Sequence, residues 1–259
     1  MAYKVDFHTH TYYSDGTMKP TDLVRMYKDR EYDIISITDH DGVDGIKEAQ
    51  IAGEALKIQV VSGIELATAY DYKGEETEFH LLGYYIDPDN ELLTETIADL
   101  REKRNERNKK LISFLNEKGY ELTEEELTEG KPGKYIGKPD FVRAMKKKGY
   151  DTENVWELLN SVKKEMISIE DAIKVVKEAG GLPVLAHPFK TRGLGEKDSK
   201  EFWDALNEIL RDLKKKGLKG IECYHPSVNQ EQGNNLAYIA GKLHMHVTEG
   251  SDFHGTEEN

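Results

Sequence analysis

The chain has 259 residues, a size that fits one large domain or one domain carrying an insertion. Its hydrophobic fraction of 37% and its 7 prolines exclude an intrinsically disordered chain, and no apolar run reaches the roughly 20 residues that a membrane helix needs. The net charge of −13 excludes a protein that coats nucleic acid through a basic surface, and the start has no signal-peptide pattern, so we expect a cytoplasmic protein.

Seven strand-like segments alternate with helical patterns along the chain. The predicted strands are Tyr3–His8, Asp33–Thr38, Gln59–Thr68, Glu78–Ile86, Leu182–Ala186, Gly220–Tyr224 and His246–Glu249. The predicted helices are Pro20–Arg30, Gly45–Leu56, Ile169–Ala179, Asp198–Lys216 and Asn229–Leu243. This alternation predicts mainly parallel strands joined by right-handed crossovers, and therefore an α/β barrel.

One long stretch, residues 87–166, breaks the alternation because it offers helices and turns but no strand. It contains a charged helix over Leu92–Lys118, an acidic segment over Thr123–Thr128, and a loop leading into a basic helix within Gly133–Lys148. Residues 101–148 hold 14 Lys and Arg against 9 Asp and Glu, a net charge of +5 in an acidic protein. We expect residues 87–166 to form a helical cap that attracts anionic substrates, inserted into a barrel domain of residues 1–86 and 167–259.

Metal-binding side chains recur where the predicted strands end. His8 and His10 are two residues apart, a spacing that puts both imidazoles on one face of a strand end. The other candidates at strand ends are His40, Glu65, His187, Asp252 and His254. The active site of a parallel βα barrel lies at this end of its strands. The pattern therefore favours a shared site over the separate interpretations of helix caps, exposed strand ends and turn histidines.

His80 lies near the start of its predicted strand. We expect that strand to run antiparallel after a hairpin at residues 71–76, which brings His80 to the same rim. With a single cysteine, Cys223, the chain has no thiolate cluster. Imidazoles and carboxylates without thiolates favour Mn, Fe or Zn. Taken singly, Asp39 and Asp41 are better explained as helix caps and His225 as a surface residue.

Six short runs together resemble the four motifs of the PHP (polymerase and histidinol phosphatase) family of metal-dependent phosphoesterases. They are Asp6–His10, Ser14–Gly16, Ile37–Asp41, Gly63–Glu65, Ala186–Pro188 and Gly250–Gly255. Their order is most similar to a stand-alone bacterial branch that includes nucleoside 3',5'-bisphosphate phosphatases and exonucleases that trim 5' ends. The resemblance implies a distorted (β/α)7 barrel, similar to a TIM barrel, with a helical insertion between His80 and His187.

The resemblance also implies a site for up to three divalent ions, Mn, Fe or Zn. One ion would bind His8, His10, Glu65 and Asp252; a second would bind His80, His187 and a bridging Glu65; a third would bind Asp15, His40 and His254. A hydroxide held between two ions would attack phosphorus. Asp252 and His254 are the expected catalytic residues, with Asp252 guiding the attacking water as a base.

Substrate recognition follows the family pattern less closely. Members of the branch carry an Arg and a His in a motif like IGRPH, where this chain has Lys138 and Asp140 within Ile136–Asp140. Lys138 keeps a positive charge for a distal phosphate without the bidentate fork of Arg. Further candidates for substrate binding are Lys190, Arg192 and His225. For all four, an ordinary solvated surface residue is an equally good interpretation.

The predicted function is hydrolysis of a phosphate monoester of a small phosphorylated metabolite. The favoured substrate is a nucleotide of the 3',5'-bisphosphate type or a short oligonucleotide end. Histidinol phosphatase is an alternative with the same barrel and metals. A metal-dependent amidohydrolase, whose barrel also opens with HxH, and a non-catalytic PHP module are less favoured, since no ligand of the pattern is missing. The sequence indicates no obligatory protein partner and no membrane association.

Overall fold

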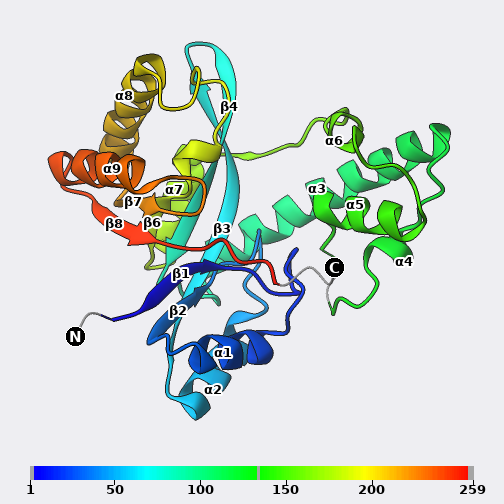
Figure 1. The fold of residues 1–259 in the computed structure, drawn as a ribbon, viewed down its shortest axis with the longest axis horizontal. Coiled ribbons are helices and arrows are strands. Elements are labelled where there is room, and N and C mark those ends of the chain that lie inside the picture. Colours follow the sequence, from blue (N-terminus) through cyan, green and yellow to red (C-terminus); the bar gives the residue numbers. More distant parts are fainter. Residues whose placement is uncertain (1–2, 133–134, 256–259) are drawn as a thin grey trace.

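The protein is described here by a computed structural model that covers residues 3–132 and 135–255. Its strands follow one another around a nearly closed barrel in the order β1-β2-β3-β4-β6-β7-β8 (Figure 1). These strands are β1 (Val5–Thr9), β2 (Ile34–Ile37), β3 (Gln59–Tyr72), β4 (Glu75–Tyr84), β6 (Leu182–Leu185), β7 (Gly220–Tyr224) and β8 (His246–Glu249). All seven predicted strands are present, and the predicted α/β barrel is confirmed. The short β5 (Ile167–Ser168), which was not predicted, pairs with β3.

Strand β4 runs antiparallel to both of its neighbours, β3 and β6, whereas the other pairs around the barrel are parallel. Lys73 and Gly74 connect β3 to β4, and both have positive φ, at 57° and 88°, as a tight hairpin turn requires. The predicted hairpin is therefore confirmed. The expected position of His80 near the start of its strand is wrong, because β4 begins at Glu75 and His80 lies in its middle, opposite Ala67.

The barrel closes between its first strand and the segment after its last. Thr9 and Phe253 form a parallel bridge. The backbone N–H of His10 donates to the carbonyl of Phe253 at 2.8 Å. This closure places the start of the chain beside residues 251–254, which carry the last sequence motif.

Five helices pack on the outside of the barrel: α1 (Pro20–Asp29), α2 (Ile46–Leu56), α7 (Ile169–Glu178), α8 (Lys200–Lys216) and α9 (Gln230–Lys242). They agree with the five predicted helices to within two residues at each end. Helix α7 buries one apolar face against β3, β4 and β6. Ser168 accepts a hydrogen bond from the N–H of Asp171 and so caps its start.

The insertion contains α3 (Glu91–Glu117), α4 (Glu124–Leu127), α5 (Lys138–Lys147) and α6 (Val155–Leu159), and it extends from the barrel as an arm (Figure 1). Part of the predicted loop, residues 133 and 134, lies outside the described residues. Helix α3 packs Leu93 and Leu100 into the large barrel cluster, while Leu111 and Leu115 belong to a separate apolar cluster of the insertion. Because α3 contributes to both clusters, the domain division at residues 87 and 166 stays a prediction. Among the described residues, no helix is both long and apolar enough to cross a membrane.

Candidate metal centre

The carboxylate of Glu65, which is fully buried on β3, is surrounded by five imidazoles. Its Oε2 lies 3.3 Å from Nε2 of His8, 3.3 Å from Nε2 of His10 and 3.1 Å from Nδ1 of His40. Its Oε1 lies 2.8 Å from Nδ1 of His80 and 2.9 Å from Nε2 of His187. Side chains at or just after the ends of β1, β2 and β6, together with His80 in the middle of β4, therefore converge on one carboxylate.

Eight of the nine predicted ligands gather in overlapping groups around this carboxylate. Three sets have ligand atoms within 4.8 Å of one another: His8, His10, Glu65 and Asp252; His10, Asp15, His40 and His254; and His40, Glu65 and His80. The first set has the membership expected for one ion. The second adds His10 to the expected set, and in the third His40 stands where His187 was expected, although His187 also contacts Glu65. Ligation of an ion by these residues stays a prediction.

The donor atoms of these groups fit a metal. Buried polar atoms in proteins almost always have a hydrogen-bond partner. Within the described part of the chain, several at this site have none: His8 Nε2, His10 Nδ1 and Nε2, Asp15 Oδ1, Glu65 Oε2 and Asp252 Oδ1. Imidazole nitrogens and carboxylate oxygens without thiolate sulfur suit Mn, Fe or Zn.

The charges of the cluster are strongly coupled. Burial by itself raises the pKa of Glu65, but the neighbouring His40, His8 and His80 hold it well below its usual range. Burial by itself lowers the pKa of His10, yet the carboxylates of Asp252 and Glu65, which lie 3.1 and 3.3 Å from its Nε2, raise it to about 10. The carboxylate of Glu65 therefore stays ionised in the buried site, as a cation site requires.

Glu222 on β7 supports the cluster from behind, and the sequence analysis missed it. Its Oε1 lies 2.9 Å from Nδ1 of His8, and its Oε2 accepts the backbone N–H of His187 at 2.8 Å. The first contact fixes the ring so that Nε2 faces Glu65 and Asp252. The signal in the sequence is a carboxylate inside the short apolar strand Gly220–Tyr224, because a buried charge needs a partner.

The interpretation of Asp39 and Asp41 as helix caps is wrong. Helix α2 starts after Gly45 and has no side-chain cap. Asp39 instead accepts hydrogen bonds from the N–H and hydroxyl of Thr11, at 2.7 and 2.6 Å, and from the hydroxyl of Ser14 at 2.6 Å. It thereby holds the loop that carries Asp15. Asp41 forms a buried ion pair with Arg104 of the insertion.

Two of the four substrate-binding candidates lie at the cluster. Lys190 forms an ion pair with Asp252, and Nε2 of the buried His225 lies 3.5 Å from Oδ2 of the same carboxylate. The interpretation of His225 as a surface residue is therefore wrong. Lys138 lies in the insertion, where it donates to Asn160. Within the described residues, the side chain of Arg192 has no hydrogen bond or ion pair, so its role in substrate binding stays a prediction.

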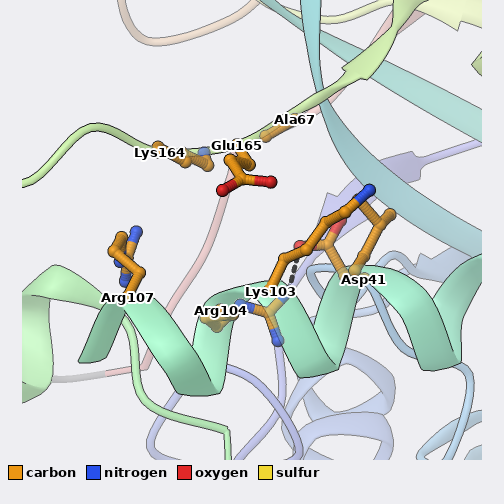
Figure 2. Close-up of a pocket in the computed structure, with 8 residues that line it drawn as sticks. Asp41, Ala67, Lys103, Arg104, Arg107, Lys164 and Glu165 are labelled. Carbon is orange, nitrogen blue, oxygen red and sulfur yellow. Dashed lines mark hydrogen bonds and ion pairs between the residues drawn. The ribbon is translucent and has the colours of Figure 1, made fainter. Parts of the chain in front are cut away.

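A cleft lies between the barrel and the insertion (Figure 2). It is lined by Asp41, Ala67, Leu100, Lys103, Arg104, Arg107, Lys164 and Glu165. Asp41 follows His40 in the chain, and Ala67 lies opposite His80 in the sheet. Two lining residues are thus direct neighbours of cluster residues, and four of the eight lining residues are cationic.

Arg107 is the unusual cation in this cleft. Its side chain is only 8% exposed, and it donates through Nε and Nη2 to Oδ1 of Asn108. Within residues 3–132 and 135–255 it has no carboxylate partner. A buried guanidinium without an anion is unfavourable, so Arg107 is suited to bind an anionic ligand. The spacing of Arg104 and Arg107 on one face of α3 is the signal that the sequence analysis did not use.

The chain is similar to several known proteins along nearly its whole length. The chain is 30% identical to a phosphoribosyl 1,2-cyclic phosphate 1,2-diphosphodiesterase of Eggerthella lenta, across 96% of this chain and 94% of the relative. It is 27% identical to a 5'-3' exoribonuclease of Haemophilus influenzae, across 98% and 91%. It is 26% identical to a 3',5'-nucleoside bisphosphate phosphatase of Chromobacterium violaceum, across 98% and 88%.

Solved structures share the fold. A protein of Bifidobacterium adolescentis described as a metal-dependent phosphoesterase superposes with a TM-score of 0.85 at 28% identity, covering 100% of this chain and 91% of that one. A Chromobacterium violaceum protein described as an amidohydrolase gives a TM-score of 0.86 at 24% identity, covering 98% and 89%, which shows the fold alone. The sequence matches the PHP domain over residues 6–225. With this match and with the predicted motifs gathered at one end of the barrel, the chain belongs to the PHP domain family.

Proposed function

We propose that the protein hydrolyses a phosphate monoester of a nucleotide, of the 3',5'-bisphosphate type or at a short oligonucleotide end, at a site for up to three divalent ions. Membership of the PHP family makes it a metal-dependent phosphoesterase. The observation that carries the finer proposal is the buried cluster of unpartnered donor atoms around Glu65 beside a cleft with four cationic side chains. Such a site suits a substrate with one phosphate at the ions and a second anionic group nearby.

The ions, when bound, supply an activated water and neutralise the charge of the phosphoryl group. One ion would be held by His8, His10, Glu65 and Asp252. A second ion would be held by His80, His187 and Glu65, and a third by Asp15, His40 and His254. Lys190 and His225 both contact Asp252. We assign to these two residues the stabilisation of negative charge on the phosphoryl oxygens and on the leaving oxygen.

For the second anionic group, Arg107 is a better candidate than Lys138. Arg107 is buried without a carboxylate partner in the described residues and offers the planar fork that binds phosphate oxygens in pairs. Lys138 already donates to Asn160. Burial lowers the pKa of Lys138, and the positive charges of the nearby Lys164 and Arg107 lower it further. We therefore assign the binding of the second anionic group to Arg107 in place of Lys138.

The test is phosphate release by the Mn-loaded protein from five compounds, with elemental analysis of the same sample. They are adenosine 3',5'-bisphosphate, AMP, a 5'-phosphorylated dinucleotide, histidinol phosphate and ribose 1,2-cyclic phosphate 5-phosphate. We expect the wild-type protein to prefer the bisphosphate or the dinucleotide. We expect Arg107→Met to raise KM for the bisphosphate at least about tenfold and to change KM for AMP little. A preference for histidinol phosphate or the cyclic compound would contradict the proposed substrate class. The cyclic compound is included because the Eggerthella lenta relative carries that activity in its name.

A further inference from the structure

The loop that carries Asp15 is held from two sides. From the barrel, Asp39 binds Thr11 and the hydroxyl of Ser14. From the insertion, Nζ of Lys131 donates to the backbone carbonyl of Ser14 at 2.7 Å. Ser14 precedes Asp15, whose carboxylate lies 3.2 Å from His254 and 3.6 Å from His40. The contact made by Lys131 is therefore one peptide unit from a predicted metal ligand.

Lys131 is itself fixed by Asp140. The two side chains are 6% and 2% exposed, with Nζ 2.7 Å from the carboxylate. Asp140 also accepts the backbone N–H of Gly137 at 2.8 Å at the start of α5 and pairs with Arg143. A lysine buried to this degree stays charged only with such a partner. The carboxylate at position 140 thus gives Lys131 a fixed place over the Asp15 loop.

The same segment of the insertion approaches a second predicted ligand. The ring of Tyr135 lies parallel to the imidazole of His40, with 6.3 Å between the ring centres and 10° between the planes. Arg104 lies 4.3 Å above Tyr135 and pairs with Asp41, the residue after His40. Two of the three residues assigned to the third ion, Asp15 and His40, therefore sit on loops that the insertion contacts directly.

We propose that the buried Lys131–Asp140 pair is a positioning device that holds Asp15 in place for the ion bound by Asp15, His40 and His254. This inference rests on the ligand assignment in the proposed function. It gives the insertion a second role beside substrate recognition, because the third ion site is complete only when the insertion is docked on the barrel.

The experiment is a titration of Mn²⁺ into the metal-free full-length chain, followed by calorimetry and by elemental analysis after gel filtration. The variants are Lys131→Met, Asp140→Asn and the double variant. Asp15→Asn serves as the reference for loss of the ligand itself. Lys147→Met and Glu129→Gln form the matched control, because that ion pair lies in the same insertion and is well exposed. Thermal unfolding of each metal-free variant separates a change in binding from a failure to fold.

We expect Lys131→Met to weaken, by about 10- to 100-fold, the same ion whose binding Asp15→Asn weakens; this is the range typical of residues that orient metal ligands. The double variant should lose no more than Lys131→Met, because the two residues act as a unit, and the control variants should bind like the wild type. Unchanged Mn²⁺ binding in Lys131→Met would overturn the proposal, even with a lowered unfolding temperature. Loss of an ion in Asp15→Asn but not in Lys131→Met would overturn the positioning role and leave the proposed function standing. Loss in both, with no phosphate released from any compound by the wild type, would support the positioning role and contradict the proposed function.

Discussion

The carboxylate of Glu222 lies 2.9 Å from Nδ1 of His8, and Nε2 of the same ring faces the carboxylate of Glu65. Both partners are fully buried. One residue outside the predicted ligand set thus fixes the orientation of a residue inside it. Its second oxygen accepts the N–H of His187, so both carboxylate oxygens are occupied.

Replacing Glu222 with Gln tests this arrangement at nearly constant volume. An amide has one acceptor oxygen, so it can accept from His8 or from the N–H of His187 but not from both with good geometry. We expect affinity for Mn²⁺ or Zn²⁺ to fall by about 10- to 100-fold, measured by competition with a chelating dye. Wild-type affinity in this variant would show that His8 does not depend on Glu222 for its orientation.

Gly250 allows the close approach of the last motif to His8. A Cβ at this position would lie 2.3 Å from Cβ of His8 and 2.5 Å from Oε1 of Glu222. We expect Gly250→Ala to displace both side chains, lower the free energy of unfolding by about 2 kcal/mol or more and abolish metal binding. Gly241→Ala is the control, since nothing lies within 4 Å of its Cβ, and it should stabilise α9 by about 0.5 kcal/mol. Urea denaturation of the two variants gives the comparison.

Asp39 satisfies three buried donors in the loop before Asp15. Asp39→Ala leaves the N–H and hydroxyl of Thr11 and the hydroxyl of Ser14 without their acceptor. At about 1 to 3 kcal/mol for each buried donor that stays unsatisfied, we expect a loss of about 3 kcal/mol in the free energy of unfolding. Asp44→Ala, which breaks an exposed pair with Arg101, should change it by less than about 1 kcal/mol. Equal losses in the two variants would contradict a supporting role for Asp39.

The single thiol reports on the folded state. Cys223 is fully buried on β7, and burial, followed by the charge of Glu222, raises the pKa of its thiol to about 12. The reactive form is the thiolate, so at pH 8 the folded protein should react with a disulfide reagent at least about a hundredfold more slowly than the unfolded chain. Mn²⁺ should slow labelling further if it binds only the folded state. Rapid stoichiometric labelling of the native protein would contradict the described packing of β7.

The sequence predicted the parts of the molecule that depend on local pattern. The strands and the clustering of histidines at strand ends follow from the alternation of apolar and helical segments. The hairpin before β4 follows from the expectation that His80 lies at the same rim as the other histidines. Helix α6 and strand β5 escaped prediction because five and two residues are too few to show a period.

The residues that support the site were not predicted, for a different reason. Glu222 has its role through contacts with His8 and His187, far away in the chain, and Arg107 lines a cleft that α3 forms with distant parts of the barrel. A carboxylate in a strand or an arginine on a charged helix gives no local sign of these neighbours. Asp39 was interpreted through the nearest helix, although its partners are in the loop after β1. Sequence patterns locate ligands at strand ends, but they do not show which side chains orient those ligands.

The closure of the barrel sets an order for the assembly of the site during folding. Glu65 and His80 are joined by a hairpin and meet after a loop of only 15 residues closes, which is a local and fast event. Ser251 reaches Asp6 across 245 positions of sequence, so Asp252 joins His8 and His10 only when the two ends of the barrel meet. We therefore expect the half of the site built on β3 and β4 to form early, and the half between β1 and residues 251–254 to be completed later, when the ends of the barrel meet.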